Sequence, residues 1–254
     1  MTNALAPLLD GQLAFLKEKL AFADDPREAV HGADLTDRTV LRDILARYGE
    51  AYPGQDPRAV ASLWSKWHFA VVLEPALATN MLLDWALPTG LGDIGLIFTA
   101  EARAQALKVS RAGHAFKPAT AEARFAALID GHLEPVIAAL AGETGITPRV
   151  LWSNAGNYFE HALRTVERAT SSAQPGVVHA KALLASRTRA DGRPNPLFEP
   201  VYYLDQQAET GRRRRICCIR YLIPEQKYCG ACPIVRKDRA SRDADERQAA
   251  RART

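Results

Sequence analysis

All four cysteines of this 254-residue chain lie close together near its C-terminal end, and this clustering limits most strongly how the chain can fold. They are Cys217, Cys218, Cys229 and Cys232, in the spacing Cys-Cys-x10-Cys-x2-Cys. A disulfide framework would spread cysteines along the chain, whereas clustered cysteines in a reducing compartment indicate metal or redox chemistry. The segment around them is therefore expected to fold about one bound group.

The spacing of the cysteines narrows the choice of bound group. Thiolates are soft ligands that suit zinc and iron–sulfur clusters. Neighbouring side chains on a strand point to opposite faces, so Cys217 and Cys218 can reach one site only if the backbone turns there. An ordinary zinc ribbon would instead use two Cys-x2-Cys knuckles. Spacing alone leaves iron–sulfur and zinc as even alternatives, with free thiols as a third.

Composition and charge exclude several classes of protein. The net charge of +4 and a pI near 8.9 are too mild for a dedicated nucleic-acid binder. No apolar run approaches the roughly 20 residues of a membrane span, so no stable membrane insertion is expected. The first residues lack the pattern of a secretory signal, which favours a cytoplasmic location.

Apolar periodicity predicts helices over most of the first two thirds of the chain. One is expected over residues 8–20, and a second is capped by Thr36. Asp56 followed by Pro57 is a strong start signal for a third helix, which is expected to kink at Pro75. Later helices are expected over 120–140, 147–169 and 177–186.

The remaining segments favour strands and breaks. Alternating apolar residues predict a short β-hairpin near 93–110, with its turn at Glu101–Arg103. After the break at Asp191–Pro196, Phe198–Leu204 and Arg214–Leu222 are expected to be strands. The predicted fold class is therefore mainly α with a small β component (α+β). The predicted organisation is a helical body over 1–205, a cysteine-bearing segment over 206–237 packed on it, and a disordered charged tail over 238–254.

The cysteine pattern resembles that of the FhuF-type siderophore ferric-iron reductases, whose four cysteines hold an atypical 2Fe–2S cluster. Several flanking segments resemble the same family: Ser62–Trp67, Leu151–Asn154, Asn195–Phe198, Arg215–Leu222 and Cys229–Pro233. The resemblance covers roughly residues 60–235. It implies that Cys217, Cys218, Cys229 and Cys232 bind a 2Fe–2S cluster and carry the electron transfer.

The resemblance also implies a reaction and its partners. The substrate would be ferric iron in a hydroxamate-type siderophore, which one electron converts to ferrous iron for release. Nothing in the sequence matches a complete nucleotide or flavin fingerprint, so the electron is expected from a separate ferredoxin or flavin reductase. A transient association with the siderophore uptake machinery is a further expectation.

Two groups of residues are candidates for docking the substrate or the electron donor. The run Arg212, Arg213, Arg214 and Arg215 precedes the first cysteine and could attract an anionic partner, or could be a solvated basic strand end. Trp152 and Tyr221, with nearby tyrosines, could line a pocket for the chelate, although aromatic residues are more often part of a core.

Two other functions remain open from the residues alone. One is a zinc-stabilised binding protein with a structural four-cysteine site, and the other is an iron–sulfur sensor that regulates rather than reduces. The Gly90–Gly95 segment matches G-x-G-x-x-G, but a helix precedes it and a strand follows it, so a turn into the hairpin is expected rather than nucleotide binding.

Overall fold

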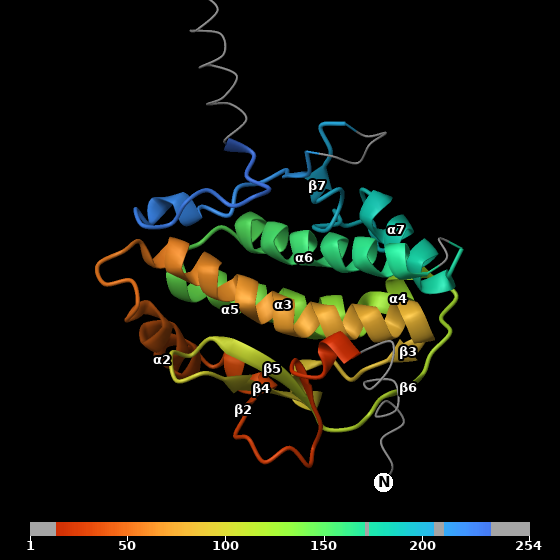
Figure 1. Cartoon of the computed structure of the whole chain (residues 1–254), viewed down its shortest axis with the longest axis horizontal. Coiled ribbons are helices and arrows are strands. Elements are labelled where there is room, and N and C mark those ends of the chain that lie inside the picture. The colour runs from red at the N-terminus through yellow and green to blue at the C-terminus, as the bar shows by residue number, and fades with distance from the viewer. Residues whose placement is uncertain (1–13, 171–172, 206–210, 235–254) are drawn as a thin grey trace, which may run out of the picture.

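The computed structural model describes residues 14–170, 173–205 and 211–234, and helices form most of it. Its longer helices are α2 (Arg38–Gly49), α3 (Pro57–Leu83), α4 (Ala121–Leu128), α5 (Glu134–Thr144), α6 (Pro148–Ala169) and α7 (Pro175–Ala185). In Figure 1, α3 lies between a small sheet on one side and α6 on the other. The segment with the cysteines lies beside the N-terminal ends of α3 and α6. The expected α+β class is confirmed.

The central helix α3 begins where the sequence predicts. The Asp56 side chain accepts a hydrogen bond from the Arg58 N–H, and Pro57 occupies the first turn. The helix does not stop at Pro75 but continues to Leu83. Thr79 donates its hydroxyl proton to the Pro75 carbonyl within this continuous helix. Because α3 is continuous, its N-terminal half can contact the cysteine segment while the rest of the helix packs in the core.

Two N-terminal predictions need correction. Residues 14–16 form a 3-10 turn, and Leu20–Ala21 is strand β1 rather than helix; residues 8–13 lie outside the described part. Helix α2 is capped by Asp37, whose carboxylate accepts from the Thr39 and Val40 N–H groups, rather than by Thr36. Aspartate directly before the first helical residue supplies the acceptor that these N–H groups need.

The predicted hairpin is confirmed as β4 (Ile94–Phe98) and β5 (Ala104–Val109), which pair antiparallel. They are the centre of a four-stranded sheet in the order β1-β5-β4-β2, with β2 at Val30–His31. Gly90 precedes a 3-10 turn, η3 (Leu91–Asp93), that leads into β4, as expected for a turn into the hairpin. A second, small sheet pairs β3 (Trp85–Ala86) with β6 (His114–Ala115).

The helix expected over 120–140 is longer and irregular. A π-helical turn, η4 (Ile129–Leu133), joins α4 to α5, and the run ends at Gly145 in the left-handed conformation. By length and composition this run, Ala121–Thr144, could span a membrane, and 44% of its most apolar window is buried inside the protein. The expectation that no apolar run approaches the length of a membrane span does not hold for this segment.

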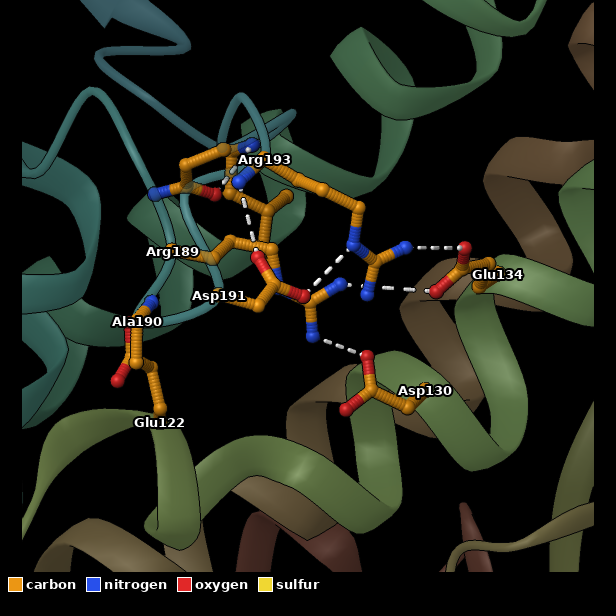
Figure 2. Close-up of polar contacts among 9 residues, drawn as sticks. Glu122, Asp130, Glu134, Arg189, Ala190, Asp191 and Arg193 are labelled. Carbon is orange, nitrogen blue, oxygen red and sulfur yellow. Dashed lines mark hydrogen bonds and ion pairs between the residues drawn. The ribbon is translucent and has the colours of Figure 1, made fainter.

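The loop after α7 covers the polar face of this helical run. Arg189 pairs with Asp130 and Glu134, and Arg193 pairs with Glu134 and Asp191. Figure 2 shows these arginines reaching from the loop toward the carboxylates on the helices. The acidic side chains of the run are thus held by protein partners.

The two strands expected before and through the cysteines are much shorter than predicted. Only Val201–Tyr202 (β7) and Arg213–Arg214 (β8) pair, in antiparallel register. Arg220–Leu222 is a 3-10 turn, η5, rather than part of a strand. The predicted domain limits at 205 and 237 stay predictions, and the tail expected over 238–254 lies outside the described residues.

Candidate metal centre

The backbone turns directly after the adjacent cysteine pair, as its spacing requires. Strand β8 ends at Arg214, and Ile219 adopts the left-handed conformation with a φ of 52°. The Ile219 N–H donates to the Cys217 sulfur at 3.3 Å. At the other end, the Cys232 N–H donates to the Cys229 carbonyl and closes the Cys-x2-Cys turn. Each cysteine pair thus lies at a turn of the backbone that a local hydrogen bond stabilises.

Hydrogen bonds bring the two cysteine pairs together. The Arg214 N–H donates to the Ala231 carbonyl at 2.8 Å. The sulfurs of Cys218 and Cys229 lie 3.8 Å apart. Cys218 and Cys232 are buried, Cys217 and Cys229 are half-buried, and all four thiols are free. One thiol of each pair is therefore withdrawn from water and the other lies nearer the surface.

The electrostatic surroundings favour negative charge at Cys218. Hydrogen bonds with the Cys217 and Cys229 thiols, and the positive charges of Lys66 and Arg214, hold the pKa of Cys218 well below its usual range. The hydrogen bond with Cys218, together with burial, raises the pKa of Cys217, and the same two causes raise that of Cys229. The Lys66 ammonium donates to the Cys218 sulfur at 3.0 Å. Thiolate is the form in which cysteine binds metal.

Helices α3 and α6 fix the cysteine segment through buried polar residues. Ser62 on α3 donates to the Cys218 carbonyl at 2.6 Å. Ser153 on α6 donates to the Ile216 carbonyl at 3.0 Å. Asn154, which is fully buried, donates to Ser62 and to Ser65 and so joins the two helices. The family-like segments noted around residues 62–67 and 151–154 therefore meet at the cysteines.

The four arginines of the 212–215 run occupy different environments. Arg212 forms an ion pair with Glu160 at 2.6 Å and donates to Asn157. Arg214 is buried and donates to Asn154 at 2.5 Å. Arg215 is exposed and pairs with Glu199, whereas Arg213 is half-buried. The run is thus partly internal, and its role in docking stays a prediction.

Trp152 and Arg215 line one cavity beside the cysteine segment. The cavity has a volume of about 520 Å³, and its wall includes Ile216, which directly precedes Cys217. Phe198 and Arg149 also contribute to the wall. The structure thus brings together two of the residues that the sequence singled out for docking.

Tyr221 is not part of that cavity. Its ring contacts that of Tyr228, with centroids 5.9 Å apart, and both tyrosines are exposed on the loop between the two cysteine pairs. This aromatic pair lies on the surface rather than in the core.

The donor set fits a 2Fe–2S cluster. Its four free cysteines lie in one segment, with the Cys218 and Cys229 sulfurs 3.8 Å apart, and thiolates are the usual ligands of such a cluster. Zinc requires four ligands around one ion, whereas a 2Fe–2S cluster divides its four cysteines between two irons. The buried Arg214 Nε has no partner among the described residues. Such an N–H suits the sulfur atoms of a cluster, which accept hydrogen bonds.

Sequence reasoning missed the residues around the sulfurs. Lys66 lies 152 positions before Cys218 and Ser62 lies 156 positions before it, and Asn154 belongs to a separate helix between them in the chain. These residues do belong to segments that resemble the family. A resemblance in sequence, however, does not show which side chains contact one another.

Comparisons with known proteins agree with this arrangement. A family model described as ferric iron reductase FhuF-like transporter matches residues 62–211, and one described as FhuF 2Fe-2S C-terminal domain matches residues 214–233. The chain is 25% identical over 216 residues to the ferric siderophore reductase of Escherichia coli strain K12. The aligned region covers 82% of this chain and 80% of that protein. The expected resemblance and the 2Fe–2S cofactor are confirmed.

Proposed function

This chain belongs to the FhuF family of ferric iron reductases, and we propose that it reduces ferric iron held by a hydroxamate-type siderophore in the cytoplasm. Cys217, Cys218, Cys229 and Cys232 are the proposed ligands of its 2Fe–2S cluster. The single observation that carries the proposal is the meeting of the two cysteine pairs, with the Cys218 and Cys229 sulfurs 3.8 Å apart, against the family-like segments of α3 and α6.

The protein residues have separate tasks in this proposal. When bound, the cluster supplies a one-electron carrier whose potential depends on the hydrogen bonds and charges around its sulfurs. Burial of Cys218 and Cys232 excludes water from one side of the site. Ser62, Ser153 and Arg214 hold the backbone of the cysteine segment on the helices.

The cavity beside Ile216 is the proposed siderophore site. Its volume of about 520 Å³ lies within the usual range of small-molecule pockets, roughly 300–1,000 Å³. Trp152 and Phe198 offer apolar surface to the organic backbone of the chelate, and Arg149 offers a positive charge to its oxygen donors. One electron converts Fe³⁺ to Fe²⁺, which hard oxygen donors hold less tightly, so the metal is released.

The electron is proposed to come from a separate protein, either a ferredoxin or a flavin reductase. The exposed pair Tyr221 and Tyr228, with Lys227 between Tyr221 and Cys229 in sequence, is a surface of the cysteine segment outside the siderophore cavity. This separation supports a donor that reaches the cysteines while the siderophore is bound. A transient association with the siderophore uptake machinery is part of the same proposal.

A single-turnover reaction tests this function. The protein, reduced chemically under anaerobic conditions, is mixed with a ferric hydroxamate siderophore, and ferrous iron is captured by a chromogenic chelator. We expect about one ferrous iron per reduced cluster, because the cluster passes one electron at a time. A reduced protein that stays reduced and releases no ferrous iron would favour the sensor function instead.

A Trp152→Ala variant tests the cavity in the same reaction. We expect the siderophore concentration at half-maximal rate to rise roughly tenfold, which corresponds to about 1.4 kcal/mol of lost binding. Trp67→Ala is the matched control, since Trp67 is exposed and does not line the cavity. Equal effects of the two substitutions would place the siderophore elsewhere.

A further inference from the structure

Helix α3 contacts Cys218 through both its backbone and its sulfur. Ser62 donates to the Cys218 carbonyl, and Lys66, one turn later on the same face, places its ammonium 3.0 Å from the Cys218 sulfur. Lys66 is half-buried, so its charge is screened less by water than that of an exposed lysine. Among the interactions of the described residues, this hydrogen bond joins a charged side chain directly to a cysteine sulfur.

The charge of Lys66 is not neutralised by a neighbouring acid in the described part of the chain. Arg212 and Arg215 are paired with Glu160 and Glu199. By contrast, Lys66 and the buried Arg214 have no carboxylate within ion-pair distance among the described residues, and their polar contacts are with sulfur, hydroxyl and amide groups. Two cations without a carboxylate partner among the described residues, Lys66 and Arg214, therefore lie on the buried side of the cysteine site.

We propose that Lys66 is a positioning residue that sets the electron affinity of this site: its ammonium holds the Cys218 sulfur and raises the midpoint reduction potential of the 2Fe–2S cluster. The inference rests on the proposed function to the extent that Cys218 is a cluster ligand. Reduction adds one negative charge to a centre that its thiolates already make negative. A fixed cation at hydrogen-bond distance stabilises that added charge more than it stabilises the oxidised form.

A higher potential has opposite effects on the two halves of the reaction. Transfer of an electron from the donor to the protein becomes more favourable, and transfer from the protein to ferric iron becomes less favourable by the same amount. Lys66 thus divides the available driving force between electron entry and electron delivery. Its removal is expected to slow reduction by the donor and to strengthen the reducing power toward the siderophore.

An equilibrium redox titration of the intact, cluster-loaded protein, without siderophore, tests the proposal. For Lys66→Met we expect the equilibrium constant for reduction to fall at least tenfold, which is a shift of 59 mV to more negative potential for one electron. Lys66→Arg keeps a charged N–H donor and should recover most of the potential. Lys227→Met is the matched control, because Lys227 is an exposed lysine on the loop between the two cysteine pairs and should give a clearly smaller shift.

Each outcome decides the proposal. A Lys66→Met protein that keeps its cluster and its wild-type potential would overturn it, and so would an equal shift in Lys227→Met. Loss of the cluster from both Lys66→Met and Lys66→Arg would make Lys66 an assembly residue and would also overturn it. Since no siderophore is present in the titration, failure of siderophore reduction is detected separately, by the single-turnover reaction.

Discussion

At the scale of single residues, a buried histidine pair is a polar feature of the core that lies apart from the cysteines. The Nε2 atoms of His68 and His132 lie 2.9 Å apart, and His132 Nδ1 contacts the Thr89 carbonyl at 3.0 Å. Trp64 stacks on His68. The sequence showed no ligand spacing among its histidines, because this pair joins α3 to the π-helical turn η4, 64 positions later.

This pair predicts a loss of stability in mild acid. Burial lowers the pKa of His132 from 6.5 to about 4 and that of His68 well below its usual value. Since the unfolded chain then binds protons more readily than the folded one, stability is complete above about pH 7 and declines as the pH falls from 6.5 toward 4. One such histidine accounts for roughly 3 kcal/mol of free energy of unfolding over this range.

Thermal unfolding measured between pH 7.5 and 4.5 checks this expectation. The wild-type midpoint should fall as the pH falls, and the double substitution His68→Gln/His132→Gln should flatten that dependence. His31→Gln is the control, since His31 is exposed. A slope that is unchanged in the double variant would show that other groups govern the acid sensitivity.

At the scale of elements, helices α3 and α6 are joined to the cysteine segment by Asn154. Its amide group donates to Ser62 and Ser65, and its carbonyl oxygen accepts from Arg214. Because these partners are buried, removing the amide leaves several polar groups without hydrogen bonds. Asn154 therefore links the folding of the helices to the position of the cysteines.

An Asn154→Ala substitution should both weaken the fold and loosen the cluster. We expect the free energy of unfolding to fall by about 3 kcal/mol, since each unsatisfied buried group costs roughly 1–3 kcal/mol. Denaturant unfolding gives the stability, and the decay of visible absorption under a chelator gives the cluster lifetime. Asn157→Ala, on the same helix but half-buried, should cost less and leave the lifetime near that of the wild type. Similar cluster lifetimes in both variants would contradict this linking role.

The elements also show what the sequence can and cannot predict. Helices α3 and α6 start where predicted, because aspartate or threonine followed by proline is a local signal that needs no distant partner. The strand expected over Phe198–Leu204 shrinks to two residues. Glu199 adopts a positive φ of 38°, and the Tyr203 hydroxyl donates to Glu160 on α6. This tertiary contact is absent from the alternating pattern that suggested a strand.

Some features of the candidate site were likewise predictable from the sequence, and others were not. The four cysteines and the need for a turn after Cys218 were predictable, because soft ligands and strand geometry act locally. The contact of Lys66 with Cys218 was not, since it depends on how α3 packs against a segment 152 positions away. The sequence offers no way to separate the aromatic docking candidates, whereas the fold places Trp152 in the cavity and Tyr221 on the surface.

At the scale of the whole molecule, the layers give the cysteine segment a rigid support. The sheet covers one side of α3, and α6 and the cysteine segment lie on the other (Figure 1). The described core is continuous from the sheet through α3 to Ile223, which directly follows the η5 turn. The cysteine segment is therefore fixed to the core, while the cavity beside Ile216, which is the proposed siderophore site, and the exposed tyrosines lie outside that core.

The most direct test of the central claim is the iron and sulfide content of anaerobically purified protein, with zinc measured in parallel and Cys232→Ser as the ligand variant. The account predicts a coloured wild-type protein with about two irons and two sulfides per chain. It predicts loss of most of that iron and sulfide in Cys232→Ser, with helical content largely retained. A colourless wild-type protein with about one zinc per chain, or a Cys232→Ser variant that keeps its full cluster, would contradict it.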